Sequence, residues 1–136
     1  MRILRAAILY FLAVFAAGCV LGPIRVLVLA PRIGAFRAVL CEAPFLIAAM
    51  VLAARWVGRC IPLATVSQRA AMGAAALALT LSAEIAGAIW LRDLTVTGAF
   101  AELGAPEGVL SLGLFALFAV LPALNAPPRP TASARG

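Results

Sequence analysis

The sequence predicts an all-α protein, a four-helix transmembrane bundle, and three observations lead to that prediction. Hydrophobic residues make up 65% of the 136 residues, charged residues make up 12%, and the mean hydropathy is +1.13. Such a chain has too few polar side chains to cover a water-soluble fold. Its apolar residues gather in four stretches, each close to the roughly 20 helical residues that cross a bilayer. A chain of this length has room for one domain, which we place at residues 1–125.

The four predicted spans cover about residues 3–22, 38–57, 70–91 and 108–124. The first follows two arginines and ends at Gly22-Pro23, because proline lacks an amide hydrogen and commonly breaks a helix. The second ends beside Trp56 and the third beside Trp90, and indole side chains prefer the membrane interface. The fourth is near the lower length limit for a span, so we expect it to stand with little tilt.

Two segments lie outside these spans. Residues 23–37 join the first two spans, and the apolar run from Val26 to Ala30 within them is too short to cross a bilayer. Such a segment either lies in the membrane interface or re-enters the bundle. Residues 126–136 contain three prolines and almost no apolar side chain, which predicts a disordered tail.

The arginines predict the orientation, because positively charged loops are retained on the cytoplasmic side. All eleven basic residues are arginine, and with the N-terminus inside, seven lie on the cytoplasmic side and four outside. The seven are Arg2, Arg5, Arg55, Arg59, Arg69, Arg129 and Arg135, and the four are Arg25, Arg32, Arg37 and Arg92. We therefore expect a multi-pass protein of the bacterial inner membrane with both termini in the cytoplasm.

A second interpretation of the N-terminus is a bacterial lipoprotein signal. Arg2 and Arg5, an apolar run and then Ala16-Ala17-Gly18-Cys19 fit a signal after which Cys19 becomes the lipidated first residue. However, Val20 and Leu21 continue the apolar run, whereas a mature lipoprotein usually begins with polar residues. We therefore favour an uncleaved first span.

Five ionisable side chains are predicted to lie near one end of the bundle. Glu42 falls in the first turn of the second span, and Glu84 lies about 10 Å below the outer end of the third span at 1.5 Å per residue. Arg25, Arg32 and Arg37 approach from the same side. Because an unpaired charge in hydrocarbon is costly, we predict that these five residues form a buried charge network near the outer leaflet.

Small residues predict where helices approach each other closely. Gly18 and Gly22 are four residues apart in the first span, and the third span has a stripe of small and polar residues on the same face as Glu84. Stripes of this kind allow close helix contact in membranes. We therefore predict helix packing at Gly18, Gly22, Gly73, Thr80 and Gly87, with Glu84 pointing into the bundle.

Several function classes find no support in the sequence. The chain has no His, and it has no nucleophile and base pair at a catalytic spacing, so we predict that it is not an enzyme. Cys19, Cys41 and Cys60 lack the paired spacing of a zinc or redox motif, so we predict no metal and no other cofactor. The arginines are scattered between the spans, which argues against a nucleic-acid partner.

Several short motifs resemble those of a family of small bacterial four-helix inner-membrane proteins. The motifs are Gly22-Pro23-Ile24-Arg25, Pro31-Arg32-Ile33-Gly34, Glu42-Ala43-Pro44, the lone Glu84 in the third span, and Leu114-Phe115-Ala116-Leu117-Phe118 before Pro122. The resemblance covers most of the chain up to Pro122. That family has no assigned activity, so the resemblance implies the fold and the location but no chemistry.

Two hypotheses about function remain open. The first is a non-enzymatic membrane protein that packs against lipid and against either a second copy of itself or another membrane protein, with the charge network specifying the bundle. The second is a small proton-coupled transporter or anion carrier, in which Glu84 exchanges a proton and Arg25 or Arg32 binds an anionic group. The scarcity of polar residues in the spans favours the first.

Overall fold

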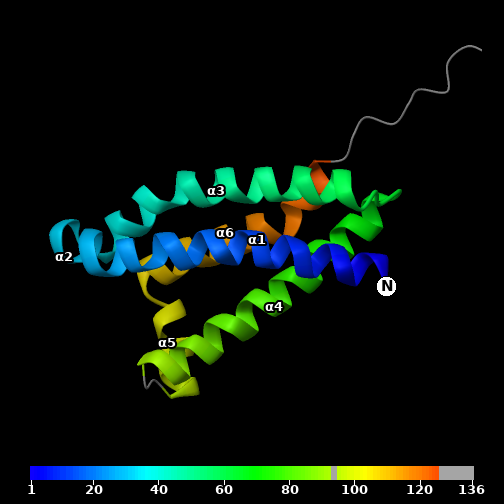
Figure 1. Ribbon diagram of the computed structural model, residues 1–136. Helices are drawn as coiled ribbons and strands as arrows, with labels where there is room; N and C mark the ends of the chain where they lie inside the picture. The colour runs from blue at the N-terminus through cyan, green and yellow to red at the C-terminus, as the bar shows by residue number, and fades with distance from the viewer. Residues whose placement is uncertain (93–94, 126–136) are drawn as a thin grey trace, which may run out of the picture.

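The computed structural model describes residues 1–92 and 95–125 of the chain, and every element within these ranges is a helix (Figure 1). Their order is α1 (Arg2–Ile24), the π-helix η1 (Arg25–Leu29), α2 (Ala30–Ile33), α3 (Ala35–Cys60), α4 (Val66–Arg92), α5 (Val96–Leu103) and α6 (Pro106–Leu124). The protein is therefore an all-α helical bundle, as the sequence predicts.

Four helices are long and apolar enough to cross a membrane, which confirms the four-span prediction. The candidate spans are Arg2–Ile33, Ala35–Cys60, Val66–Trp90 and Pro106–Leu124. Three of them contain a predicted span in full, and the third predicted span, 70–91, runs one residue beyond Trp90. The short helix α5 between the third and fourth spans was not predicted. The predicted disordered tail, residues 126–136, lies outside the described residues.

The predicted helix break at Gly22-Pro23 is wrong, because α1 continues through η1 and α2 as far as Ile33. Between Pro23 and Pro31 the helix widens, and the amide of Ala30 donates to the carbonyl of Arg25, five residues earlier. Prolines are tolerated in membrane helices where such local widening rearranges the hydrogen bonds. The chain turns instead at Gly34, whose φ of 86° suits only glycine without strain. The connecting segment thus extends the first helix to the end of the bundle and does not turn back into it.

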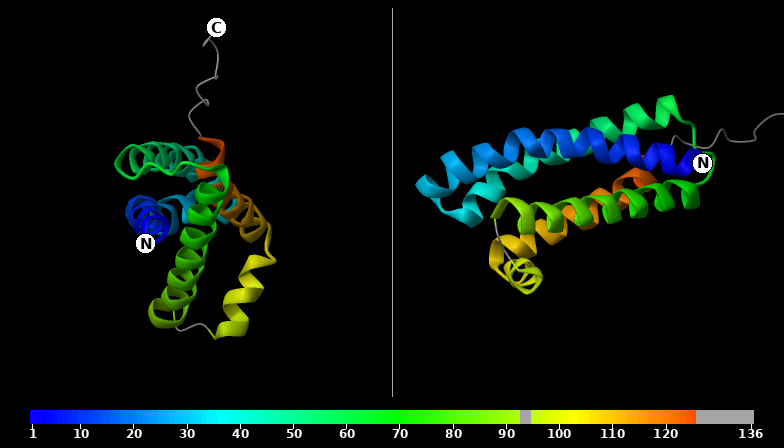
Figure 2. Two further views of the ribbon diagram at one scale, coloured as in Figure 1. Left: turned by 90° about the vertical axis from the view of Figure 1, so that its right-hand side faces the viewer. Right: turned by 60° about the horizontal axis from the view of Figure 1, so that its bottom comes forward.

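The four long helices surround a common centre. α1 packs against α3 and α4, and α6 packs against the same two helices, so that α1 and α6 lie diagonally opposite each other (Figure 2). Met1, the 61–65 turn and the end of α6 lie at one end of the bundle, here called the terminal end, and α2 and α5 lie at the other (Figure 1). Arg69 holds the terminal end together, because its guanidinium donates to the carbonyls of Leu63 at 2.8 and 3.1 Å and of Asn125 at 3.3 Å.

One contact crosses the centre of the bundle from α1 to α6. The rings of Tyr10 and Phe118 stack with centroids 4.5 Å apart, and both side chains are almost fully buried. The hydroxyl of Tyr10 also donates to the backbone carbonyl of Phe118 at 3.1 Å. That carbonyl lacks its usual helical donor, because the residue four positions later is Pro122 and has no N–H. Tyr10 therefore supplies, from another helix, the hydrogen bond that Pro122 cannot make.

Close packing of α4 against α6 is limited to the terminal half of the bundle. A Cβ atom built on Gly73 would overlap the carbonyl oxygen of Ala119 in α6, so only glycine allows this approach. Ala76, one turn later, is fully buried. Towards its C-terminal end α4 runs obliquely away from α1 and α3 (Figure 1). The bundle is therefore tight near the termini and widens towards the α2 and α5 end.

Replacing Tyr10 with Phe keeps the ring stack but leaves the Phe118 carbonyl without a donor. We expect this change to lower the free energy of unfolding by about 1 kcal/mol, within the range of interhelical hydrogen bonds in membrane proteins. The second variant, Pro122→Ala, restores a helical N–H to that carbonyl, so Tyr10→Phe should cost less in its background. Unfolding by denaturing detergent, followed by circular dichroism, gives the double-mutant cycle. If Tyr10→Phe lowers the free energy of unfolding equally with Pro122 and with Ala at position 122, Tyr10 does not replace the hydrogen bond that Pro122 lacks.

Candidate functional site

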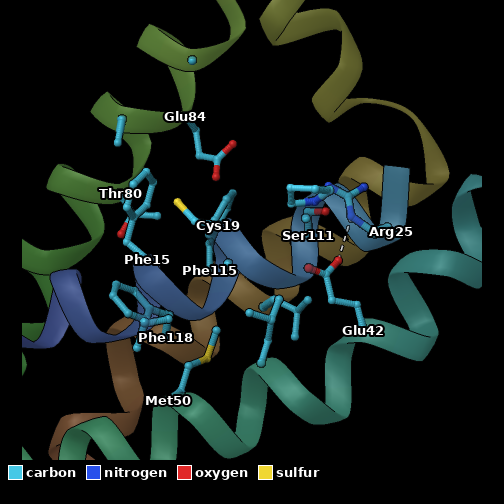
Figure 3. A pocket seen from close by; sticks show the side chains of 18 of the residues that line it. Phe15, Cys19, Arg25, Glu42, Met50, Thr80, Glu84, Ser111, Phe115 and Phe118 are labelled. Carbon is cyan, nitrogen blue, oxygen red and sulfur yellow. Dashed lines mark ion pairs between the residues drawn. The ribbon is translucent and has the colours of Figure 1, made fainter. Parts of the chain in front are cut away.

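A cavity of about 430 Å³ lies between the long helices in the half of the bundle where they diverge (Figure 3). Its volume is within the range of about 300–1,000 Å³ typical of small-molecule sites. Phe118 lines it, so the Tyr10 and Phe118 stack closes the cavity towards the terminal end. Most of its lining is apolar, and all four spans contribute to it. The polar side chains in the lining are Arg25, Glu42, Thr80, Glu84 and Ser111.

An ion pair between Arg25 and Glu42 forms one wall of the cavity (Figure 3). Nε of Arg25 lies 2.7 Å from Oε2 of Glu42, and the two side chains are 34% and 7% exposed. The Nε–H bond is not directed at the carboxylate oxygen, so the contact is held by charge rather than by an aligned hydrogen bond. The pair joins η1 to α3 at the point where the π-helix begins.

Glu84 enters the same cavity from α4, away from the ion pair (Figure 3). It forms no ion pair with any side chain described in the structure. Glu84 is exposed, and it is one of the residues that line the cavity. Thr80 and Ser111 donate their hydroxyl hydrogens to carbonyls of their own helices, those of Ala76 and Glu107. Their oxygen lone pairs remain available on the cavity wall.

The predicted charge network is therefore smaller than five residues. Arg25, Glu42 and Glu84 share the cavity, but Arg32 and Arg37 are exposed and form no ion pair within the described part of the chain. Because the first helix continues past Pro23, Arg32 lies about 10 Å further along it than Arg25. Arg37 precedes Glu42 by five residues, which places it about 140° around α3.

The predicted packing glycines divide into two groups. Gly73 makes the predicted close contact, with Ala119 of α6. Gly18 and Gly22 do not, because a Cβ atom on either would meet nothing within 4 Å. Both line the cavity, as do Thr80 and Gly87 of the α4 stripe. The first residue of the stripe, Gly73, contacts α6, whereas Thr80 and Gly87 line the cavity, because α4 diverges from the other helices along its length.

Sequence reasoning missed the aromatic part of the lining. Phe15 of α1 and Phe115 and Phe118 of α6 all face the cavity. A signal for them was present, because Ser111, Phe115 and Phe118 are spaced by four and three residues and so share one face of a helix. In the described residues no group of three or more His, Cys, Asp or Glu side chains could hold a metal ion.

Comparisons with protein-family models, with curated proteins and with solved structures find no match to this chain. The resemblance to the family of small bacterial four-helix inner-membrane proteins therefore stays a prediction.

The ion pair makes a specific prediction about stability. Replacing Arg25 with Leu leaves the Glu42 carboxylate buried and unpaired, and we expect a loss of about 2–3 kcal/mol, below the 3–5 kcal/mol of a fully buried pair because Arg25 is one-third exposed. Replacing Glu42 with Leu as well should recover most of the loss. Glu84→Gln serves as the comparison and should change the melting temperature little. A loss from Glu84→Gln as large as that from Arg25→Leu, measured by thermal unfolding in detergent, would contradict the pairing.

Proposed function

We propose that this chain is a non-enzymatic, multi-pass protein of the bacterial inner membrane that holds a small amphipathic molecule in the cavity between its spans. The single observation that supports the proposal is the convergence of polar side chains from all four spans on one cavity of about 430 Å³. Ionisable residues within membrane spans are costly and usually mark a functional site. Of the three ionisable residues in the cavity lining, Arg25 and Glu42 form a pair, and Glu84 faces the open space of the cavity.

A role in packing alone accounts for less of the cavity. If small residues served only to bring helices together, a neighbouring helix would occupy the space beside each of them, as α6 does at Gly73. Gly18 and Gly22 are instead open to the cavity. Contact with a second copy of the chain or with another membrane protein remains part of the proposal, since a protein of four spans offers much lipid-facing surface for it. The Arg25 and Glu42 pair then specifies the bundle, and the cavity provides the binding site.

A second candidate function is a small proton-coupled carrier, and the placement of Glu84 favours it. A carboxylate without an ion-pair partner in a membrane cavity is a group that can take up and release a proton during transport. The anion-carrier version is less well supported, because the charge of Arg25 is offset by Glu42 and Arg32 lies outside the cavity. A pH-dependent flux in proteoliposomes that is lost in Glu84→Gln, with the fold intact, would favour the carrier.

The proposed orientation places the cavity in the outer half of the membrane, because the arginine distribution puts the terminal end in the cytoplasm. A cytoplasm-active reporter fused after Asn125 should therefore give signal, and a periplasm-active reporter at the same position should not. The reverse result would move the cavity to the cytoplasmic half. An N-terminus that begins at a diacylated Cys19, detected by mass spectrometry, would restore the lipoprotein interpretation.

Filling the cavity tests the proposed function. Gly18→Leu adds a side chain where the cavity is open, so we expect the variant to fold but to lose any co-purifying small molecule. Native mass spectrometry of protein extracted in mild detergent measures the bound mass. Gly113→Leu is the matched control, because Gly113 is exposed, has open space around it and does not line the cavity. A wild-type protein that carries no additional mass, or an additional mass that persists in Gly18→Leu, would contradict the proposal.

A further inference from the structure

The charges that line the cavity do not cancel. Arg25 contributes one positive charge, and Glu42 and Glu84 contribute two carboxylates. Because Nε of Arg25 lies 2.7 Å from Glu42, these two charges offset each other locally. Glu84 is left as the excess charge, and it points into the open part of the cavity (Figure 3).

The rest of the lining suits an apolar molecule. Phe15, Phe115 and Phe118 present aromatic rings to the cavity, and Met50 and Leu114 add aliphatic surface. The faces of aromatic rings attract cations as well as hydrocarbon, and quaternary ammonium groups are commonly bound in this way. A site with one excess carboxylate among aromatic rings is complementary to a positive charge carried on an apolar body. An anion would instead meet Glu84 and the remaining oxygen of Glu42.

The side of the cavity between α1 and α4 is lined by exposed residues and by small residues. Cys19 of α1 and Glu84 of α4 both line the cavity and are both exposed. The facing residues on this side are small, with Gly18 and Gly22 on α1 and Gly87 on α4. A bulky apolar group could therefore pass between the two helices from the lipid without displacing large side chains.

From these observations we infer that the cavity binds the cationic nitrogen of an amphipathic ammonium compound, with Glu84 as its counter-ion and the phenylalanine rings around its apolar part. The inference rests on the proposed binding function and names its ligand class. The ammonium group has two sources with the same chemistry, a free lipophilic amine or the headgroup of an aminophospholipid. The charges of Arg25 and Glu42 offset each other, so Glu84 determines the net charge of the cavity lining.

Protection of Cys19 measures binding inside the cavity and not in the surrounding detergent. Cys41 and Cys60 are exposed and lie outside the cavity lining, so replacing both with Ala leaves Cys19 as the single thiol. The experiment measures the rate at which a maleimide modifies Cys19 in the full-length protein in neutral detergent. The two competitors are tetraphenylphosphonium and tetraphenylborate, which have nearly the same size and shape but opposite charge.

We expect tetraphenylphosphonium to slow the modification at concentrations at least tenfold lower than tetraphenylborate does. Glu84→Gln should weaken the protection by tetraphenylphosphonium about tenfold to a hundredfold, because the attraction between two opposite charges is lost. Glu107→Gln is the matched control, because Glu107 is a carboxylate of α6 that does not line the cavity, and it should leave the protection unchanged. Slower modification in phosphatidylethanolamine nanodiscs than in phosphatidylglycerol nanodiscs identifies the lipid headgroup as the source, and equal rates identify a free amine.

Four other results would contradict the cationic ligand or the binding cavity itself. Protection by tetraphenylborate that equals or exceeds that by tetraphenylphosphonium, or protection that survives Glu84→Gln, overturns the cationic ligand but leaves a binding cavity. A reactive Cys19 that neither ion protects also overturns the cationic ligand. A Cys19 that does not react at all means that the cavity is closed, and the proposed binding function fails with it.

Discussion

The hydrogen bond from Tyr10 to the Phe118 carbonyl ties the two diagonal helices together, and the shape of the cavity depends on it. In hydrocarbon no water can satisfy a free carbonyl, so a proline within a span needs a donor from elsewhere. Pro122 creates that need and Tyr10 meets it at 3.1 Å. The same contact stacks two aromatic rings across the centre of the bundle. The stack of Tyr10 and Phe118 therefore fills the centre of the terminal half and bounds the cavity on that side.

The division of the bundle into a tight half and an open half follows from the direction of α4. Near its start, Gly73 lets α4 lie directly against α6. Further along, α4 leaves the other helices, and the residues that would have packed become a wall (Figures 1 and 3). The ion pair between Arg25 and Glu42 joins η1 to α3 in this open half. That pair adds a polar contact between the first two spans beside the buried apolar residues Val39 and Ala43 of α3.

The spans could be predicted from the sequence because the bilayer fixes the length of a helix and excludes unpaired backbone groups. The break at Pro23 was wrong because rules for proline come from helices in water, whereas neighbouring turns of a membrane helix can widen to accommodate it. The predicted charge network included Arg32 and Arg37 wrongly, for a related reason. Spacing along the chain indicates which residues share a face of one helix, but not how far that helix extends.

The small residues show most clearly what a sequence leaves undetermined. Gly18, Gly22 and Gly73 have the same spacing signature, yet one touches a neighbouring backbone and two face open space. A small side chain is needed for a close contact, and it is equally suited to the wall of a cavity. Only the relative directions of the helices decide between the two, and these depend on contacts between residues far apart in the chain, such as Tyr10 and Phe118.

Glu84 constrains what can occupy the open half. A carboxylate that faces lipid tails without a partner is energetically costly. Filling the cavity with hydrocarbon chains alone would therefore leave this cost unrelieved, whereas water or a positively charged group would relieve it. Water alone would satisfy Glu84, but it would leave the phenylalanine rings of the lining hydrated, which is unfavourable for apolar surface. An occupant that satisfies both parts of the lining must be apolar over most of its surface and positive at one point.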